Sequence, residues 1–348
     1  MSNKSMFFGF LIAVLVNSLI FSVPLFAQDD EESAPAVLEE WEREELLSLL
    51  NLVNEAQEGE QAPHDNPFML TPTFVKGTDG NTHIPFTLTI DPEKIGESVV
   101  AVYMQVQDLS SPTEESDDDD GEGDPAFEDA FFLEVSKDGG SVYLSRAFYV
   151  PGGEYEVLIG LRDSKGPDAE EEELEAVVPL LFREKVSVPN LWNDELQTSS
   201  VIVTAVVEPQ NGMLSREEQL LYPYSQGNLR IEPKHDLNFG KTEELSFMML
   251  VYNPEASDGG VPDVTVQYNF HQITDAGEEF FNKTNPQEFN KDTLPPGFSL
   301  EAGHQVVAGY SLPLNLFPPA DYRLEISITD NEGDSEVSQN LNFTVGEE

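Results

Sequence analysis

The chain has 348 residues, with 17 Lys and Arg against 66 Asp and Glu, a net charge of −49 at pH 7, and no Cys. This acidity excludes nucleic acid and anionic lipid surfaces as partners, because neutralising phosphates requires clustered Lys and Arg. The lack of Cys excludes a disulfide framework and a lipid-bearing Cys, and the length allows about two domains, each with its own core.

Residues 1–27 have the pattern of a secretory signal peptide. Lys4 precedes an apolar run over residues 6–26, and Ala27 offers a cleavage point. An uncleaved N-terminal membrane anchor is the alternative, since the run is long enough to span a bilayer. Polar residues interrupt the run, which favours cleavage, and the mature chain is then expected to be secreted or periplasmic in a bacterial envelope, with no membrane contact.

Residues 28–64 predict an acidic linker with an amphipathic helix over 36–57. Pro35 suits its first turn and Gly59 its end. The helix either docks on its own sandwich or binds a partner, and the candidate partner-binding residues are Leu38, Trp41, Leu49 and Leu52. Docking is favoured, because monomeric proteins rarely leave such an apolar face exposed.

Residues 65–190 predict a first β-sandwich with an acidic insertion over 110–126. A unit near its end recurs later in the chain: PGGEYEVLIGLRDSKG at 151–166 corresponds to PPADYRLEISITDNEG at 318–333. In both copies a Pro-bounded corner leads to a Tyr and then to apolar residues at every second position, which predicts a strand that enters a turn. Tyr155 and Tyr322 are typical of the tyrosine corner of immunoglobulin-like sandwiches, in which the hydroxyl bonds a nearby backbone group.

The two copies differ on the other face of this strand. The second copy carries polar residues there, as expected of a sheet with one face in water; these are Arg323, Glu325, Ser327 and Thr329. In the first copy Leu158 and Gly160 weaken the contrast.

The duplication extends to neighbouring strands. Matching apolar strands are predicted at 85–92 and 247–254, at 99–106 and 264–270, and as return strands at 174–182 and 337–345. A connecting segment with one strand is expected over 191–224, followed by a second sandwich over 225–348. The sequence therefore predicts an all-β fold of two tandem immunoglobulin-like β-sandwich domains.

Calcium is the cofactor that the acidic segments suggest. Segment 114–124 approaches an EF-hand loop, but Phe127 falls where the bidentate Glu should be. The tighter turn after the second repeat is the preferred candidate for a weak calcium site, with Asp330, Asn331, Glu332 and Asp334 as its ligands.

No catalytic motif is recognisable in the sequence. It has no Gly-x-Ser-x-Gly, no His-Glu-x-x-His and no Walker loop, and its five His are scattered. A glycan-stacking face is the other hypothesis: Tyr222 and Tyr224 flank Pro223 and could share a face, whereas the pairs Phe131–Phe132 and Phe280–Phe281 should each place one ring in the core.

From Leu191 onward the order SSVIVTA, LRIEP, ELSFMMLVYNP and PADYRLEISITD resembles the C-terminal β-sandwich region of secreted bacterial proteins of the VWFA-related or GWxTD type. The chain has neither a Gly-Trp-x-Thr-Asp motif nor the Asp-x-Ser-x-Ser metal site of a von Willebrand A domain. The resemblance implies an exported sandwich module and carries over no site residues.

These observations favour an exported, non-catalytic protein whose tandem sandwiches mediate protein–protein interaction or scaffolding, with another envelope or secreted protein as partner. A carbohydrate-binding accessory protein is the alternative, and an unrecognised hydrolase is third.

Overall fold

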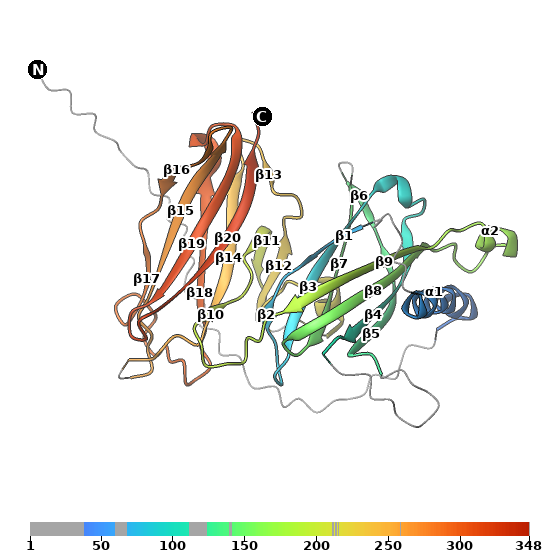
Figure 1. The fold of residues 1–348 in the computed structure, drawn as a ribbon, viewed down its shortest axis with the longest axis horizontal. Helices are drawn as coiled ribbons and strands as arrows, with labels where there is room; N and C mark the ends of the chain where they lie inside the picture. The colour runs from blue at the N-terminus through green and yellow to red at the C-terminus, as the bar shows by residue number, and fades with distance from the viewer. Residues whose placement is uncertain are drawn as a thin grey trace, which may run out of the picture. The chain divides into compact units, whose positions relative to one another are not determined.

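The structure, a computed structural model, describes residues 38–59, 68–110, 124–138, 141–210, 212, 214, 216–257 and 259–347. The described chain is built mainly of strands in several sheets and divides into two compact units (Figure 1). One, called the N-terminal unit, contains the described residues up to Leu237 together with Met248–Asn253. The other, the C-terminal unit, contains Asn238–Phe247 and residues 254–347. The predicted signal peptide and most of the acidic insertion lie outside the described residues.

The N-terminal unit contains the first sandwich, made of two antiparallel sheets. One sheet has the order β1-β3-β7-β6, with β2 also on β3, and the other has the order β5-β4-β8-β9. The strands are β1 (Phe68–Pro72), β2 (Val75–Lys76), β3 (Thr82–Ile90), β4 (Val99–Asp108), β5 (Phe127–Glu134), β6 (Ser136–Asp138), β7 (Ser141–Val150), β8 (Gly153–Asp163) and β9 (Leu180–Val188), with the 3₁₀ turn η1 (Pro92–Lys94) after β3.

The core of the first sandwich comes from inward side chains of both sheets. Alternate residues of β8, among them Val157 and Ile159, meet residues of β3 such as Phe86 and Leu88, and all four are buried. This period of two is what a strand with one face on a core requires.

The other face of β4 and β8 carries helix α1 (Glu40–Glu58) (Figure 1). A capping box joins Glu39 and Glu42 at its start, and Gly59 caps its end. Leu46, Leu49 and Val53 of the helix form a second small core with Tyr103 and Leu158. The preferred interpretation of the predicted helix, docking on its own sandwich, is therefore confirmed, and the predicted Ala36 start lies outside the described residues.

The rest of the N-terminal unit includes β10 (Gln197–Thr198), β11 (Ile202–Pro209), α3 (Arg216–Leu221) and β12 (Leu229–Pro233). These strands form a sheet with the order β10-β14-β11-β12, in which β14 (Glu244–Tyr252) has its last residues in this unit and its first in the C-terminal unit. The segment 191–224, predicted to hold one strand, holds two strands and a helix.

The C-terminal unit contains a sheet with the order β13-β20-β19-β15-β16, and β17 also pairs with β15. Its strands are β13 (Asn238–Phe239), β15 (Val264–Thr274), β16 (Gly277–Lys283), β17 (Gln287–Phe289), β19 (Ala320–Asp330) and β20 (Ser335–Val345), while β18 (Val306–Pro313) pairs with β14 and precedes the 3₁₀ turn η2 (Leu314–Leu316). The ring of Tyr268 on β15 lies 5.5 Å from that of Phe247 on β14 and 5.7 Å from that of Tyr310 on β18, so the core lies between these strands.

The duplicated strands are confirmed, with one correction. The first return strand was predicted over 174–182, but residues Glu171–Glu175 form the short helix α2 and β9 begins at Leu180. The acidic run is helical because Glu170 and Glu173 make a capping box, and Glu is a good helix former. The fold class, all-β with tandem immunoglobulin-like sandwiches, is confirmed.

No helix among the described residues has both the length and the apolar character needed to cross a bilayer.

Candidate binding site

Both repeated tyrosines are structural. The Tyr155 hydroxyl donates a hydrogen bond to the Pro151 carbonyl at 3.1 Å, and the Tyr322 hydroxyl donates to the Pro318 carbonyl at 2.7 Å. Both rings are buried, and burial raises the pKa of each hydroxyl. The predicted tyrosine corner is confirmed in each copy.

The candidate calcium turn is held together by backbone donors. Asp330 is buried; its Oδ2 accepts the Glu255 N–H at 2.7 Å, and its Oδ1 accepts the N–H groups of Glu332 and Gly333 at 3.2 Å each. The Asn331 amide donates to Asp263 and Thr265.

Glu332 and Asp334, the other two predicted ligands, are exposed, and the described residues contain no group of three or more His, Asp or Glu arranged to hold a metal ion. Asp330 thus stabilises the turn by accepting backbone hydrogen bonds, and calcium binding at this turn stays a prediction.

In the first copy, an Asp at the equivalent position also accepts hydrogen bonds from backbone N–H groups. Asp163 accepts the Gly96 N–H at 2.9 Å and the Glu97 N–H at 3.2 Å. In both copies, the Asp that ends the repeated strand therefore holds backbone N–H groups of another segment of its own unit.

The four predicted partner-binding residues of the helix region differ in burial and contacts. Leu49 is fully buried against β8, and the Trp41 ring packs on Phe132 with ring centroids 5.2 Å apart. Leu52 is half-buried beside the same small core, while Leu38 is exposed. Most of this face is covered by the chain's own sheet.

Polar contacts that the sequence did not reveal also hold the helix. The Arg183 guanidinium donates to the Ala56 carbonyl at 3.0 Å and the Gly59 carbonyl at 3.2 Å, which satisfies the helix C-terminus, and it pairs with Glu156 at 2.8 Å. Buried Arg162 donates to the Ser48 hydroxyl at 3.0 Å. A guanidinium from the adjacent sheet is a tertiary cap that no local pattern predicts.

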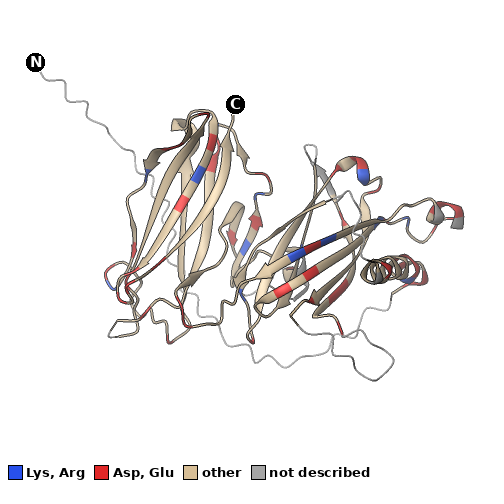
Figure 2. Cartoon of the chain, viewed as in Figure 1, with Lys and Arg blue, Asp and Glu red and all other residues tan. Residues whose placement is uncertain are grey.

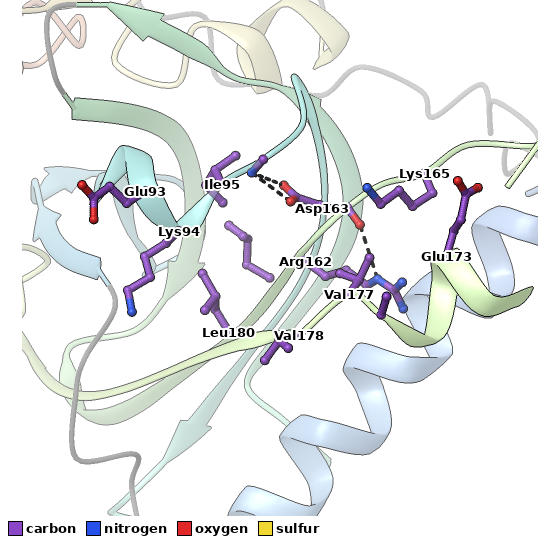
Figure 3. A pocket seen from close by; sticks show the side chains of 13 residues that line it. Glu93, Lys94, Ile95, Arg162, Asp163, Lys165, Glu173, Val177, Val178 and Leu180 are labelled. Carbon is purple, nitrogen blue, oxygen red and sulfur yellow. Dashed lines mark hydrogen bonds between the residues drawn. The ribbon is translucent and has the colours of Figure 1, made fainter. Parts of the chain in front are cut away.

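A cleft of about 450 Å³ opens where β8 ends, between η1, α2 and the start of β9 (Figure 3). Its apolar lining includes Ile95, Leu161 and Leu180. Charged side chains surround this lining: Glu93, Lys94, Arg162, Asp163, Lys165 and Glu173. Three of the chain's 17 basic residues thus line one cleft.

Much of this charge is already engaged. Arg162 also donates to the Leu174 carbonyl at 3.1 Å, and Asp163 holds the Gly96 loop. Lys165 pairs with Glu97 at 2.7 Å, and this hydrogen bond raises the pKa of the lysine. The cleft, lined by both apolar and charged side chains, is the secondary candidate site.

The main candidate is the outer face of the sheet in the C-terminal unit, called here the open face and defined by His271 on β15, Glu278 and Phe280 on β16, Arg323 and Glu325 on β19, and Asn340 on β20. Figure 2 shows acidic and basic residues alternating along this sheet. On this face Glu278, Phe280 and Asn340 are exposed, and His271, Arg323 and Glu325 are half-buried.

Arg323 is the centre of the open face. Its Nε donates to Glu278 at 2.9 Å, its Nη1 donates to Asn340, and it also lies beside Glu325 at 3.6 Å. His271 Nδ1 lies 3.2 Å from Glu278. The hydrogen bond from Arg323 lowers the pKa of Glu278, and the same bond raises that of Arg323. The guanidinium is thus held in one orientation at the surface.

Phe280 supplies an exposed aromatic ring beside this network. It is 60% exposed and meets His271 edge-on, with ring centroids 5.9 Å apart. Its neighbour Phe281 turns inward, 5.0 Å from Phe317 and 5.4 Å from Tyr322. The expected split of this ring pair between core and surface is confirmed.

The predicted glycan platform at Tyr222 and Tyr224 does not form a shared exposed face. Tyr224 is buried and bonded to the Thr87 hydroxyl at 2.8 Å, and burial raises its pKa to about 12. Tyr222 lies beneath Arg230, 4.4 Å from the guanidinium carbon to the ring centroid. This pair is therefore corrected to a structural role.

Comparison with known proteins gives no family. No family model and no curated protein matches. Among solved structures, an immunoglobulin-like protein from Pseudomonas aeruginosa is 14% identical, over 42% of this chain and 96% of its own, with a TM-score of 0.21.

A β-glucuronidase from Parabacteroides merdae is 12% identical over 76% of this chain, with a TM-score of 0.25, and the α-2-macroglobulin from Escherichia coli is 12% identical over 81%, with a TM-score of 0.22. The chain spans only 27% and 17% of those two proteins. Likenesses this weak say nothing about activity.

Proposed function

We propose that this chain is an exported, non-catalytic binding protein whose C-terminal sandwich presents the open face to a protein partner. The observation that carries the proposal is that the repeated unit uses this face for docking in its first copy and leaves it uncovered in the second. In the first copy the face meets α1, and in the second it holds an exposed aromatic ring beside an oriented arginine.

The register shows that the two faces correspond. Val100 pairs with Asp163 in the first copy, and Val264 pairs with Asp330 in the second. Counting from these pairs places Tyr103 at the position of Gln267 and Leu158 at that of Glu325. The apolar residues that receive α1 are replaced by polar ones, so an apolar helix of the same kind does not fit the second copy.

The composition of the open face favours a protein over other ligands. Interfaces between proteins are enriched in aromatic residues and Arg, and their binding energy concentrates at a few such residues. Phe280 and Arg323 are of this type, and Ile273, 42% exposed, lies two residues beyond His271 on the same strand face. Because Arg323 is already oriented by Glu278, less side-chain freedom is lost when a partner binds.

Export and the absence of a nucleic acid partner rest on the sequence. The expected signal peptide, the lack of Cys and the net charge of −49 support a bacterial envelope or extracellular location.

Site-specific photo-cross-linking tests the proposal. A photoreactive phenylalanine analogue replaces Phe280 in residues 28–348, the chain without its expected signal peptide, and is exposed to the native envelope fraction. We expect one cross-linked protein that disappears when Arg323→Ala is added. The analogue at Leu316, 82% exposed in the same unit, is the matched control.

Cross-links that are equal at both positions, or unchanged by Arg323→Ala, would overturn the assignment. A glycan array probed with the native chain and with Phe280→Ala tests the alternative, carbohydrate binding. Glycan binding by the native chain that is lost in the variant would show that the open face binds carbohydrate instead of a protein.

A further inference from the structure

Arg162, in the cleft at the end of β8, is a buried cation without a carboxylate partner. It is 7% exposed, and none of the Asp and Glu side chains that the structure describes forms an ion pair with it. Its guanidinium donates to neutral acceptors: the Ser48 hydroxyl at 3.0 Å, the Leu174 carbonyl at 3.1 Å and the Asp163 carbonyl at 3.5 Å. A buried charge is costly unless an opposite charge and hydrogen bonds compensate it.

Other arginines that are buried or half-buried do have carboxylate partners. These pairs are Arg146 with Asp129, Arg183 with Glu156, Arg230 with Glu208, and Arg323 with Glu278. Buried Glu45 does not play this part for Arg162, because its Oε1 accepts the Lys165 N–H at 2.9 Å and its Oε2 has no hydrogen-bond partner within the described chain. A guanidinium has five N–H donors, so Arg162 keeps two, one on each Nη, that no described residue accepts.

A second cation of the cleft is also available. Lys94, from the 3₁₀ turn η1, is exposed, and its ammonium forms no ion pair with any side chain that the structure describes. Two of the carboxylates in the cleft are instead held by backbone donors: Asp163 accepts two N–H groups, as described above, and Glu173 accepts the Glu170 N–H at 3.2 Å. Arg162 and Lys94 thus offer two positive charges to one anionic group.

The rest of the lining indicates which kind of anion fits. Three basic and three acidic side chains line the cleft, so their formal charges cancel and leave no positive excess for a dianion such as phosphate. Ile95, Leu161 and Leu180 add apolar surface, and the volume of about 450 Å³ lies in the range of small-molecule sites. A single carboxylate joined to an apolar body matches both features.

We propose that this cleft binds a small monocarboxylate with an apolar body, and that Arg162 is the counter-ion of the carboxylate (Figure 3). The two remaining N–H groups of the guanidinium donate charge-assisted hydrogen bonds to the ligand, which are stronger than bonds between neutral groups. Lys94 adds attraction, and the apolar body lies against the apolar lining. The inference stands on the cleft of the N-terminal unit and is independent of the partner assigned to the open face.

Isothermal titration calorimetry on residues 28–348 with three probes tests the proposal. Sodium octanoate has both the carboxylate and the apolar body, 1-octanol has the body without the charge, and sodium acetate has the charge without the body. We expect saturable binding of one octanoate per chain, and binding at least about tenfold weaker for each of the other two probes. Equal affinities for octanoate and octanol, or no binding of octanoate, would overturn the proposal.

Two charge-reversal variants separate the cleft from the overall charge of the chain. Lys94→Glu should weaken octanoate binding by about fivefold, and because Lys94 is exposed the variant should fold normally. Lys283→Glu, exposed on β16 in the C-terminal unit, makes the same change in net charge and should leave the affinity unchanged. Equal losses in the two variants would mean that long-range repulsion acts instead of a contact in the cleft, which would overturn the proposal.

Arg162→Gln removes the counter-ion itself and should make octanoate bind no better than octanol. Since Arg162 also holds α1 and α2, methyl NMR of the native chain locates the ligand without any substitution. Octanoate should shift the methyl signals of Val178 and Leu180, which line the cleft, and leave Leu316, 82% exposed in the C-terminal unit, unchanged. Shifts of equal size at Leu316 would indicate non-specific binding and would refute the assignment.

Discussion

In both sandwiches the tyrosine corner leads into the same strand, β8 in the first copy and β19 in the second. The two copies differ in the residues on the outer face of this strand. In the first copy this face is apolar and buried under α1, with Leu158 fully buried. In the second copy the equivalent residue is Glu325, and the face bears a network of charges around Arg323. The inward residues of the two strands are equivalent, so the same core is compatible with an apolar outer face or a charged one.

The comparison shows that the outer face of the repeated strand can be apolar or polar while its inward residues stay apolar and buried. Strand residues alternate between faces, so Glu325 and Ser327 can stand where the first copy has Leu158 and Gly160 while the core positions between them stay apolar. What distinguishes a covered from an open copy is therefore the chemistry of the outward residues.

The largest expected effect comes from removing the side chain that anchors α1. Leu49→Ala should lower the free energy of unfolding of the N-terminal unit by about 2–5 kcal/mol, because it leaves a cavity between the helix and β8. Urea denaturation followed by circular dichroism measures this loss. Leu47→Ala, on the same helix but 47% exposed, should change stability by less than about 0.5 kcal/mol. Equal effects of the two substitutions would show that the helix is not docked.

Acid should weaken the N-terminal unit through His83. This side chain is half-buried, its Nε2 bonds the Pro223 carbonyl at 2.9 Å, and its buried Nδ1 has no hydrogen-bond partner among the described residues. Burial lowers its pKa from 6.5 to about 4, although the bond to Pro223 acts in the opposite direction.

The unfolded chain therefore binds more protons than the folded one between these pH values. The stabilisation from neutral His83 is complete above pH 6.5 and falls progressively as the pH drops toward 4, by about 3 kcal/mol in all. Urea midpoints measured across this range should fall less steeply in His83→Asn, which does not titrate. Parallel curves for the two proteins would refute a buried neutral His83.

A Cβ at Gly160 tests how closely the helix approaches the sheet. A Cβ there would lie 3.4 Å from the Cβ, Cδ2 and carbonyl oxygen of Leu49. A single methyl group fits at this distance, whereas the longer side chain of Gly160→Leu would enter the space that Leu49 occupies. Gly160→Leu should therefore destabilise the protein by about 1–3 kcal/mol, as small-to-large changes in packed regions do. Ser327→Leu, at the equivalent position of the second copy, should stay within about 0.5 kcal/mol. A neutral Gly160→Leu would mean that the helix can shift away freely.

Much of the architecture could be predicted because it is local. The alternation of β8 and β19, the two tyrosine corners and the ends of α1 follow from residues close in sequence, and the structure confirms them. The sequence predicts a strand from Leu174 because this residue precedes an apolar run, but the capping box of Glu170 and Glu173 makes residues 171–175 helical.

Whether the outer face of each strand is covered by another element could not be predicted in the same way. Leu158 and Gly160 weakened the alternation of the first copy, and this irregularity was the signal that something covers the strand. Identifying the cover requires contacts such as Arg183 with the Gly59 carbonyl, more than 100 residues away. The exposure of Phe280 over Phe281 also depended on the strand register, which composition does not determine.

The smallest effect is expected where the two copies are most alike. Tyr155→Phe and Tyr322→Phe each remove one hydroxyl that donates to a Pro carbonyl while leaving the buried ring in place. Each should cost about 1 kcal/mol, the net value of a typical hydrogen bond, and the two losses should agree within error. Urea denaturation of both variants measures these losses. If one corner costs far more than the other, the two copies do not share the same structural anchor, and the correspondence of their outer faces would need to be rebuilt from a different register.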